Sequence, residues 1–303
     1  DVDEVLKNHP EMQLREENIT IKKINWTDKV TSLRQISLEL NIGLDSLVFV
    51  DDSDFECDWI RKQLPEVTVF HLDGETSSYR HALGDAGMFD TLIFSLEDRQ
   101  RSEMYGLTNE RKRLLESSSS LEEYLTGLQL RAEIGIPKNN EISRISQLTQ
   151  KTNQFNLTTR RYTEGDIQHF LEEKESAVYY LRLSDRISDL GIVGVVILKF
   201  EGEQAEIDSF LFSCRALGRG AEDALFYFIL NQMVENGVTH LKGVYLSTAK
   251  NSQVSDFYEK QGFELTKQYD EVSEWSYSLK PKADHLKSYP QWISVVHELG
   301  SEK

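Results

Sequence analysis

Residues 210–222, FLFSCRALGRGAE, decide the fold of the second half of the chain. An apolar run ends at Cys214, a loop with two glycines follows, and a helical pattern begins directly after the loop. Small residues in such a loop leave backbone N–H groups accessible at the positive N-terminus of a helix, where phosphates bind. The spacing R-x-x-G-x-G over residues 215–220 therefore predicts a phosphate-binding strand, loop and helix. The alternative is that Gly218 and Gly220 only form a tight turn.

The segments on either side of this loop give the order of a whole domain. Helices are predicted at 121–128, 142–150 and 165–173, and strands at 178–183, 193–200 and 205–212. An apolar-faced helix follows the loop, and then a strand at 241–246, a helix at 254–260 and paired strands at 263–269 and 274–279. This order matches the arrangement of GNAT acyltransferases, and N-x6-Y-x3-GF over residues 251–263 resembles their final helix and turn. We expect a GNAT-like α+β domain with a mixed sheet over residues 131–283.

Two side chains of this half are candidates for catalysis. In a GNAT-like fold the thioester carbonyl of bound pantetheine lies where the strand before the loop ends, and Cys214 lies there. Arg215 and the helix N-terminus favour the nucleophilic thiolate by lowering its pKa. The alternative is a small buried hydrophobe, the usual role of an isolated cysteine. Tyr258 is the candidate acid that protonates a leaving thiolate, and aromatic packing under the loop is its alternative.

A polar run, QLTQKTNQFNLTTRR at 147–161, is unusual for a helix that covers a sheet. Amides, hydroxyls and cations there suggest a polar pocket for a hydroxylated or phosphorylated substrate. A solvated helix end and loop is the alternative. The predicted substrate-binding residues are Gln150, Lys151, Asn153, Gln154, Asn156, Thr158 and Asp185. The predicted cofactor-binding residues are Arg215, Gly218, Arg219, Gly220 and Asn251, of which Arg215 and Gly218 to Gly220 are expected to hold the phosphate of pantetheine or substrate.

The first half has a different pattern. Residues 1–96 alternate helical patterns with short apolar runs at 47–50 and 67–72, which is typical of a parallel sheet with crossover helices. Residues 97–130 are charge-rich and predict a helical connector, and residues 284–303 predict a closing C-terminal helix. The fold class expected for the chain is therefore α/β, with a parallel-sheet domain followed by the α+β domain.

Composition excludes several classes of protein. The 303 residues carry a formal net charge of −17 and 39% hydrophobic residues, which describes a globular protein that repels nucleic acid and anionic membranes. Two cysteines are too few for a disulfide framework, and no apolar run is long enough to span a bilayer. We expect a cytoplasmic protein with free thiols.

Five segments together resemble the FkbH-like family, in which subfamily IIIC HAD phosphatases are fused to a GNAT-like domain. They are NWTDK (25–29), FVDDSDFE (49–56), EDRQRSEMY (97–105), QLTQKTNQFNLTTRRYT (147–163) and FLFSCRALGRGAE (210–222). The resemblance implies an enzyme that takes a glyceryl unit from 1,3-bisphosphoglycerate, removes its phosphate, and holds the acyl group on a cysteine. It also implies transfer to the pantetheine thiol of an acyl carrier protein. The cysteine of the family's SCR motif corresponds to Cys214, which favours the catalytic interpretation of that residue.

The same resemblance assigns roles in the first half. Lys29 corresponds to the lysine that steadies a phosphoaspartate, and Asp51 and Asp52 to the acidic pair that binds Mg²⁺. A solvated helix cap is the alternative for the two aspartates. No apolar strand followed by DxDxT is present, because Asp1-Val2-Asp3 lacks both the strand and the threonine. We therefore expect a partial HAD-like sheet whose aspartyl nucleophile lies upstream of Asp1.

The sequence thus predicts an acyltransferase in a biosynthetic setting. Its predicted partners are an acyl carrier protein and a phosphorylated short hydroxyacyl donor. Two alternatives stay open, a coenzyme A-dependent GNAT N-acetyltransferase and a non-catalytic scaffold that binds carrier proteins.

Overall fold

The computed structural model describes residues 2–15, 18–40, 42–90, 111, 114–115, 117–279 and 289–298. The chain divides into two compact units, residues 1–109 and 110–303. Much of the predicted connector and parts of the predicted C-terminal helix lie outside the described residues. Among the described residues, no helix has the length and apolar character that crossing a membrane requires.

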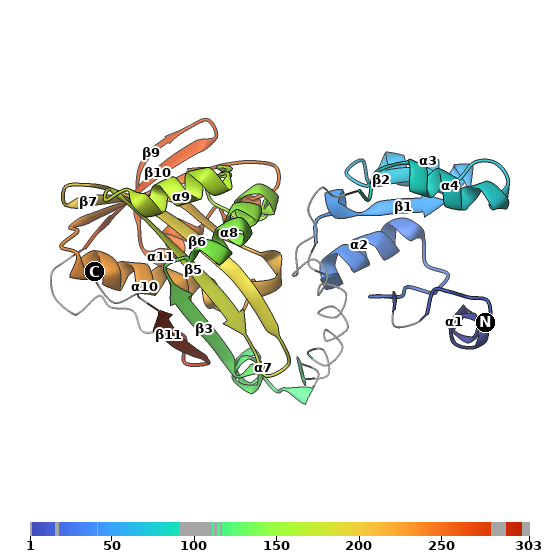
Figure 1. Ribbon diagram of the computed structural model, residues 1–303, viewed down its shortest axis with the longest axis horizontal. Coiled ribbons are helices and arrows are strands. Elements are labelled where there is room, and N and C mark those ends of the chain that lie inside the picture. Colours follow the sequence, from blue (N-terminus) through green and yellow to red (C-terminus); the bar gives the residue numbers. More distant parts are fainter. Residues whose placement is uncertain are drawn as a thin grey trace. The chain divides into compact units, whose positions relative to one another are not determined.

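The first unit contains a small parallel sheet, as predicted. Its elements are α1 (Val2–Asn8), α2 (Lys29–Leu40), η2 (Leu44–Ser46), β1 (Val48–Asp51), α3 (Asp54–Gln63), β2 (Thr68–His71), η3 (Thr76–Ser78) and α4 (Tyr79–Asp85). β1 and β2 pair in parallel, and α3 forms the crossover between them (Figure 1). Ser53 caps α3 by accepting a hydrogen bond from the Glu56 N–H at 3.4 Å. Val30, Ile60, Leu64 and Val67 form the buried core beneath the strands.

The second unit is built on one large mixed sheet. Its strands are β3 (Leu130–Gly135), β4 (Phe155–Asn156), β5 (Ser176–Ser184), β6 (Asp189–Glu201), β7 (Gln204–Phe212), β8 (His240–Leu246), β9 (Glu264–Tyr269), β10 (Val272–Ser278) and β11 (Ile293–Glu298). They lie in the order β11-β3-β5-β6-β7-β8-β10-β9, and β4 pairs with β7. Most neighbours are antiparallel, whereas β7 with β8 and β11 with β3 are parallel. The predicted mixed α+β architecture is therefore confirmed.

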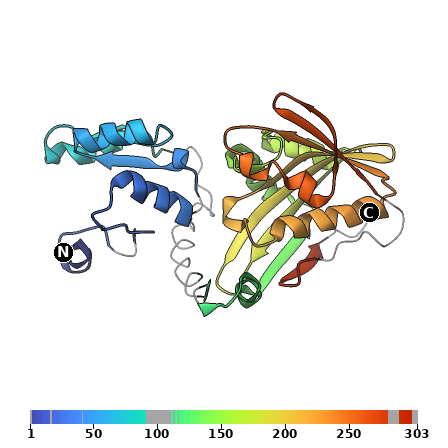
Figure 2. The ribbon, with the colours of Figure 1, turned by 180° about the vertical axis from the view of Figure 1, so that it is seen from behind.

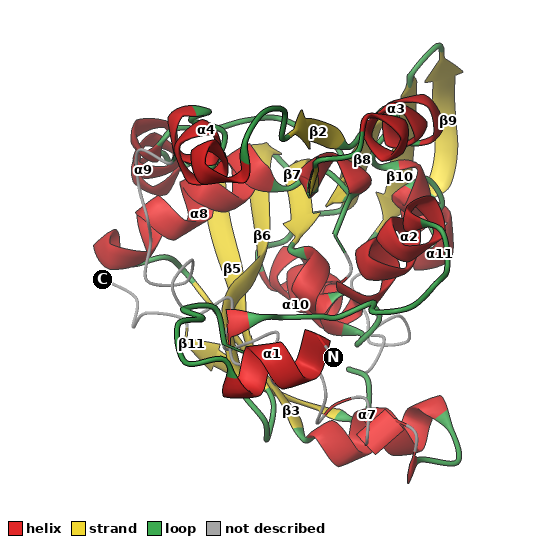
Figure 3. Ribbon diagram, turned by 90° about the vertical axis from the view of Figure 1, so that its right-hand side faces the viewer, coloured by secondary structure: helices red, strands yellow, loops and turns green. Residues whose placement is uncertain are grey.

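Helices cover both faces of this sheet. They are α7 (Leu121–Leu128), α8 (Asn139–Lys151), α9 (Glu164–Glu172), η4 (Cys214–Ala216), α10 (Ala221–Glu235), η5 (Ser252–Val254) and α11 (Phe257–Gln261). α8 and α9 lie on one face, and α10 crosses the other, which is in front in Figure 2. Figure 3 shows β5 and β6 with α8 on one side and α10 on the other. Ile145, Ile167 and Val195 are among the fully buried residues under α8 and α9.

Strands β7 and β8, which are neighbours in the sheet, separate toward the end of β7. β7 pairs with β8 only from Gln204 to Ile207, although β7 continues to Phe212. Beyond that point β4 pairs with the end of β7, and the Leu246 N–H donates to the carbonyl of Leu157 at 2.8 Å. The chain's own short strand thus bridges β7 and β8 where they diverge.

Two sequence predictions of secondary structure differ from the structure. The predicted closing helix is wrong over residues 293–298, which form β11 in parallel with β3. Ile293, Val295 and Val296 are β-branched, and an open sheet edge gives them a better-packed conformation than a helix does. The predicted helix at 254–260 is shorter, because a 3₁₀ turn ends at Val254 and α11 begins at Phe257.

Candidate functional site

The loop between β7 and α10 has the conformation that its glycines permit. The Ser213 N–H donates to the Val193 carbonyl at 2.7 Å and anchors the loop to the sheet. Cys214 begins the short helix η4, and its side chain is partly exposed. Gly218 and Gly220 have φ values of +73° and +79°, in the left-handed region that favours glycine. The structure therefore places Cys214, a partly exposed residue, at the head of a tight turn.

Both arginines of the loop are held by the protein itself. The Nε of Arg215 donates to the Ser213 Oγ at 3.4 Å. The guanidinium of Arg219 donates to Asp185 at 3.1 Å, and Arg111 donates to the same carboxylate at 2.9 and 3.0 Å. The Asp185 side chain is 0% exposed. Asp185, predicted to bind substrate, is thus the centre of a buried ion cluster, and Arg219 is directed to it.

The C-terminal segment closes over the same loop. The Trp292 indole N–H donates to the Arg219 carbonyl at 2.9 Å. A Cβ atom at Gly220 would lie 3.2 Å from Pro290 and 3.4 Å from the Trp292 ring. Glycine is therefore favoured at position 220 both by the positive φ and by the close packing of Pro290 and Trp292.

The polar run after α8 is largely folded onto its own backbone. Thr149 and Gln150 both donate to the Tyr162 carbonyl at 3.1 Å. Arg161 donates to the Thr152 carbonyl at 2.8 Å and to the Asn153 side chain. The other predicted members of the substrate pocket are Lys151, which is exposed, Gln154, which is half-buried, and Asn156 and Thr158, which are buried. None of these predicted residues is among those that line the pocket described below.

Asn251, predicted to bind the cofactor, makes hydrogen bonds within the protein. It is fully buried, and its amide donates to the carbonyls of Asn156 and Leu246, both at 2.9 Å. Its side-chain oxygen accepts from the Thr248 N–H at 2.8 Å. These hydrogen bonds connect β4, which contains Asn156, to the end of β8.

Tyr258, the predicted acid, lies in the aromatic core. It is 1% exposed and packs against Phe263 and Trp275 with ring centroids 4.8 and 6.3 Å apart. A Cβ at Gly243 would lie 2.3 Å from the Tyr258 ring, so this glycine makes room for it. Burial raises the pKa of the Tyr258 phenol. This placement favours the packing alternative over the acid.

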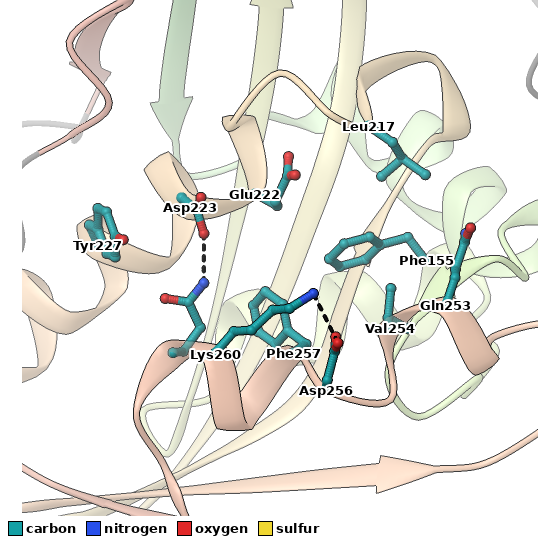
Figure 4. Close-up of a pocket in the computed structure, with 11 residues that line it drawn as sticks. Phe155, Leu217, Glu222, Asp223, Tyr227, Gln253, Val254, Asp256, Phe257 and Lys260 are labelled. Atoms are coloured by element: carbon teal, nitrogen blue, oxygen red, sulfur yellow. Dashed lines mark hydrogen bonds and ion pairs between the residues drawn. The ribbon is translucent and has the colours of Figure 1, made fainter. Parts of the chain in front are cut away.

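A pocket of about 420 Å³ lies between the first turns of α10 and α11 (Figure 4). Phe155, Leu217, Val254 and Phe257 give it apolar walls, and the other lining residues are Glu222, Asp223, Tyr227, Gln253, Asp256, Lys260 and Gln261. Leu217 connects it to the loop that Cys214 begins. Two contacts span the polar side, Gln261 to Asp223 at 2.6 Å and Lys260 to Asp256 at 2.9 Å.

Glu222 is one of the polar residues of this pocket that sequence reasoning missed. Its Oε2 is shielded from solvent and has no hydrogen-bond partner among the described residues. Burial raises the pKa of its carboxyl to about 7, while the backbone N–H groups of Glu222 and Gly218 act in the opposite direction. A glutamate in the first turn of a helix is common for dipole reasons, so the sequence alone gave no sign of its burial.

A second buried carboxylate, Asp208, lies on β7 at a bulge opposite β6. Its side chain is 0% exposed and accepts from Lys199 at 2.7 Å, from the Tyr162 hydroxyl at 2.6 Å, and from Arg160. Burial alone would raise the pKa of Asp208, but the hydrogen bonds from Lys199 and Tyr162 and the charge of Arg160 lower it below its ordinary value. This cluster is satisfied internally.

In the first unit the structure brings two of the three predicted residues together. Lys29 donates to Asp51 Oδ2 at 2.5 Å, and the other Asp51 oxygen accepts from the Ser53 N–H at 2.9 Å. The side chains are 41% and 13% exposed. The backbone carbonyl of Asp52 lies 3.3 Å from His71 Nε2. The pair is located at the carboxyl end of β1, the edge where ligands bind in parallel sheets.

These residues do not by themselves fit a magnesium ion. Both Asp51 oxygens are already engaged, and the described residues contain no cluster of three His, Cys, Asp or Glu side chains suited to a metal. Mg²⁺ prefers six oxygen ligands, several of them water, around one or two carboxylates that are free to bind it. No catalytic step is therefore assigned to a metal here.

Comparison with known proteins gives limited similarity. No family model matches the sequence, and a search of curated proteins finds no match. Among solved structures, the ribosomal-protein-S18-alanine N-acetyltransferase of Escherichia coli is similar, with 12% identity, 52% of this chain and 99% of that chain covered, and a TM-score of 0.39. The PaiA N-acetyltransferase of Thermoplasma acidophilum, in complex with coenzyme A, has 14% identity, coverage of 48% and 98%, and a TM-score of 0.36.

A third solved structure is similar to a smaller part of the chain. The N-terminal part of a Bacteroides fragilis protein, which contains a phosphatase domain complexed with magnesium, is 37% identical over 30% of this chain. Only 24% of that chain is covered, and the TM-score is 0.29. With TM-scores below 0.5, none of these likenesses assigns a function. The strand order, the diverging β7 and β8, and the glycine loop give the second unit its GNAT-like fold class.

Proposed function

We propose that the second unit is an acyltransferase that carries an acyl group on Cys214 and passes it to a pantetheine thiol. The observation that supports this most directly is the position of Cys214, partly exposed at the end of β7 and at the head of the glycine loop. A nucleophilic thiol has to be reachable and in an electropositive setting. Arg215, the next residue in the chain, supplies a positive charge for that setting.

The chemistry has two balanced steps. In the first, the Cys214 thiolate attacks the carbonyl carbon of an activated acyl donor, a C–S bond forms, and the donor's leaving group departs with the electron pair. In the second, the thiol of a pantetheine arm gives its proton to solvent, and the resulting thiolate attacks the enzyme thioester. The bond to Cys214 then breaks, and the thiolate returns to its starting state. The acyl group is finally bound to the pantetheine.

The specific substrates follow from the resemblance described above. We infer that the acceptor is the pantetheine arm of an acyl carrier protein and that the donor is a phosphorylated short hydroxyacyl compound such as 1,3-bisphosphoglycerate. The 420 Å³ pocket beside the loop has apolar walls and a polar side, which suits an arm that alternates methyl groups with amides. Tyr258 has no part in this proposal, because its phenol is buried in the core.

Mass spectrometry of the intact chain after incubation with acyl donor tests the covalent step. We expect one acyl adduct on Cys214, released when pantetheine is added. Cys57 is a matched internal control, because it is 0% exposed and burial raises the pKa of its thiol. Cys57→Ala should keep the adduct, and Cys214→Ala should lose both the adduct and the transfer.

Two other outcomes would favour the rival functions. If Cys214→Ala still transfers an acetyl group from acetyl-coenzyme A, the enzyme is a direct N-acetyltransferase without a covalent intermediate. If neither variant nor wild type shows transfer, yet the chain binds a carrier protein, a scaffold role replaces catalysis.

For the first unit we propose a part in removing the donor's phosphate. The pair of Lys29 and Asp51 at the carboxyl end of β1 supports it, since a lysine there is placed to balance charge on a phosphorylated carboxylate. The residues of this chain lack the DxDxT nucleophile motif. The expected result is therefore no turnover of an acyl phosphate by this chain alone, measured as released inorganic phosphate.

A further inference from the structure

The anion site predicted at the start of α10 already contains a carboxylate. A turn with two left-handed glycines followed by a helix N-terminus presents backbone N–H groups to an anion. The N–H groups of Gly218 and Glu222 act instead on the Glu222 carboxyl, whose pKa they lower against the effect of burial. Oε2 of the same group is shielded and has no partner among the described residues. An internal acid thus occupies the position of a bound phosphate.

The charges nearby do not compensate for this acid. Glu222, Asp223 and Asp256 line the pocket together with one cation, Lys260, which pairs with Asp256. Figure 4 shows this pair on the α11 side, and no interaction is drawn for Glu222. Of the two loop cations, Arg219, whose side chain is 14% exposed, is bound to Asp185, and Arg215 donates to the Ser213 Oγ. A second negative group brought to the loop would meet repulsion in a site of low dielectric.

A thiol carrier can arrive in two forms that differ in charge. Free coenzyme A carries a pyrophosphate next to its pantetheine, whereas the arm of a carrier protein carries one phosphodiester at its point of attachment. The pantetheine portion is uncharged in both. Apolar walls from Phe155, Val254 and Phe257 suit that uncharged portion, and a carboxyl group can accept a hydrogen bond from one of its amides.

We infer that Glu222 makes this pocket reject the pyrophosphate of coenzyme A while it admits an uncharged pantetheine arm. This inference rests on the proposed function, because it assumes that the acceptor thiol reaches Cys214 through the pocket. Glu222 is then a specificity-determining residue, and the preference for a carrier-bound arm over free coenzyme A is built into the first turn of α10.

Isothermal titration calorimetry of the full chain tests the inference without any catalytic step. The probes are pantetheine and dephospho-coenzyme A, whose pyrophosphate keeps its charge between about pH 5.5 and 8. For wild type at pH 8 we expect pantetheine to bind at least about tenfold more tightly than dephospho-coenzyme A. In the Glu222→Gln variant the affinity for dephospho-coenzyme A alone should rise, so that the two affinities come within about threefold of each other. Glu235→Gln removes the same charge at the far end of α10 and should change neither.

A second measurement needs no variant. When the pH of the wild-type solution falls from 8 to 5.5, Glu222 becomes neutral. The affinity for dephospho-coenzyme A should then rise at least about fivefold, while the affinity for pantetheine stays constant. Equal affinities of the two probes for wild type, binding of neither probe, or a Glu222→Gln variant that keeps the wild-type ratio would each overturn the inference. A missing Cys214 adduct would refute the proposed covalent route and leave this binding result intact.

Discussion

Asp208 and Glu222 lie in the same unit, and each has a carboxylate oxygen shielded from water, yet their surroundings are opposite. Asp208 receives Lys199, Arg160 and the Tyr162 hydroxyl, and its pKa is lowered. Glu222 has an oxygen without a partner, and burial raises its pKa. Burial is common to both, so the partners decide whether a carboxylate stabilises the fold.

The difference separates a structural group from a functional one. A buried charge that is fully paired fixes neighbouring elements, and here Asp208 ties β7 to β6 and to the segment after α8. A buried acid without a partner costs stability, and such a cost is commonly found where a ligand completes the site. Glu222 lines the pocket, whereas Asp208 does not.

The largest effect is expected from removing the charge of Asp208. Asp208→Asn leaves Lys199 and Arg160 without their carboxylate, and we expect the free energy of unfolding to fall by roughly 2 to 4 kcal/mol. The value is below that of a fully enclosed pair, because these cations are 48% and 35% exposed. Urea denaturation followed by tryptophan fluorescence measures it. Glu206→Gln is the control, since Glu206 is 29% exposed and pairs loosely with Arg160 at 3.8 Å, and it should cost under about 1 kcal/mol. Equal losses from the two variants would contradict the comparison.

Removing the charge of Glu222 is expected to change the free energy of unfolding in the opposite direction. Its folded pKa, about 7, lies above the ordinary value of 4.5, so the folded protein retains a proton that the unfolded chain releases between these values. The destabilisation is fully present above about pH 7 and disappears below about pH 4.5. We expect Glu222→Gln to raise the free energy of unfolding by about 2 kcal/mol at pH 8 and by almost nothing at pH 4.5.

Denaturant titrations at both pH values measure this effect. Asp223→Asn on the same turn is the control, and it should give no gain, because Asp223 already accepts a hydrogen bond from Gln261 at 2.6 Å. If the Glu222→Gln variant is less stable than wild type at pH 8, Glu222 stabilises the fold as Asp208 does, and the contrast between the two carboxylates is wrong.

The sequence was informative about the order of the elements. Between residues 121 and 279, apolar periodicity and glycine positions predicted the helices and strands with shifts of a few residues. They also placed Cys214 at the junction of strand and loop. β11 escaped prediction because a six-residue strand at an edge is stabilised by pairing with β3, which no local pattern records.

The side-chain partners were much less predictable. Asp185 was expected in a substrate pocket, but its partner Arg111 lies 74 residues earlier in the chain. Asn251 was expected to bind the cofactor because of its position before the final helix. Only the fold brings it to the Asn156 carbonyl, 95 residues away. Glu222 became a candidate only when its burial was known. Residue type and spacing thus locate a site, and long-range packing decides which of its groups are already satisfied.

A third carboxylate, Asp51, extends the comparison to a partly exposed pair and should give the smallest effect. Burial on its own raises the pKa of Asp51, but the hydrogen bonds from Lys29 and the Ser53 N–H, together with the charge of Lys29, leave that pKa below the ordinary value. The stabilisation is therefore present above the ordinary carboxyl pKa and is lost as the pH falls through the lowered one. Because Lys29 is 41% exposed, water screens the pair, and Lys29→Met should cost less than about 1 kcal/mol at pH 7. Lys62→Met, an equal change of charge at an exposed position near the end of α3, is the reference in thermal denaturation at pH 7 and pH 3. A loss at Lys29 as large as that at Asp208 would show that partner number matters and solvent exposure does not, and the distinction between the three carboxylates would fail.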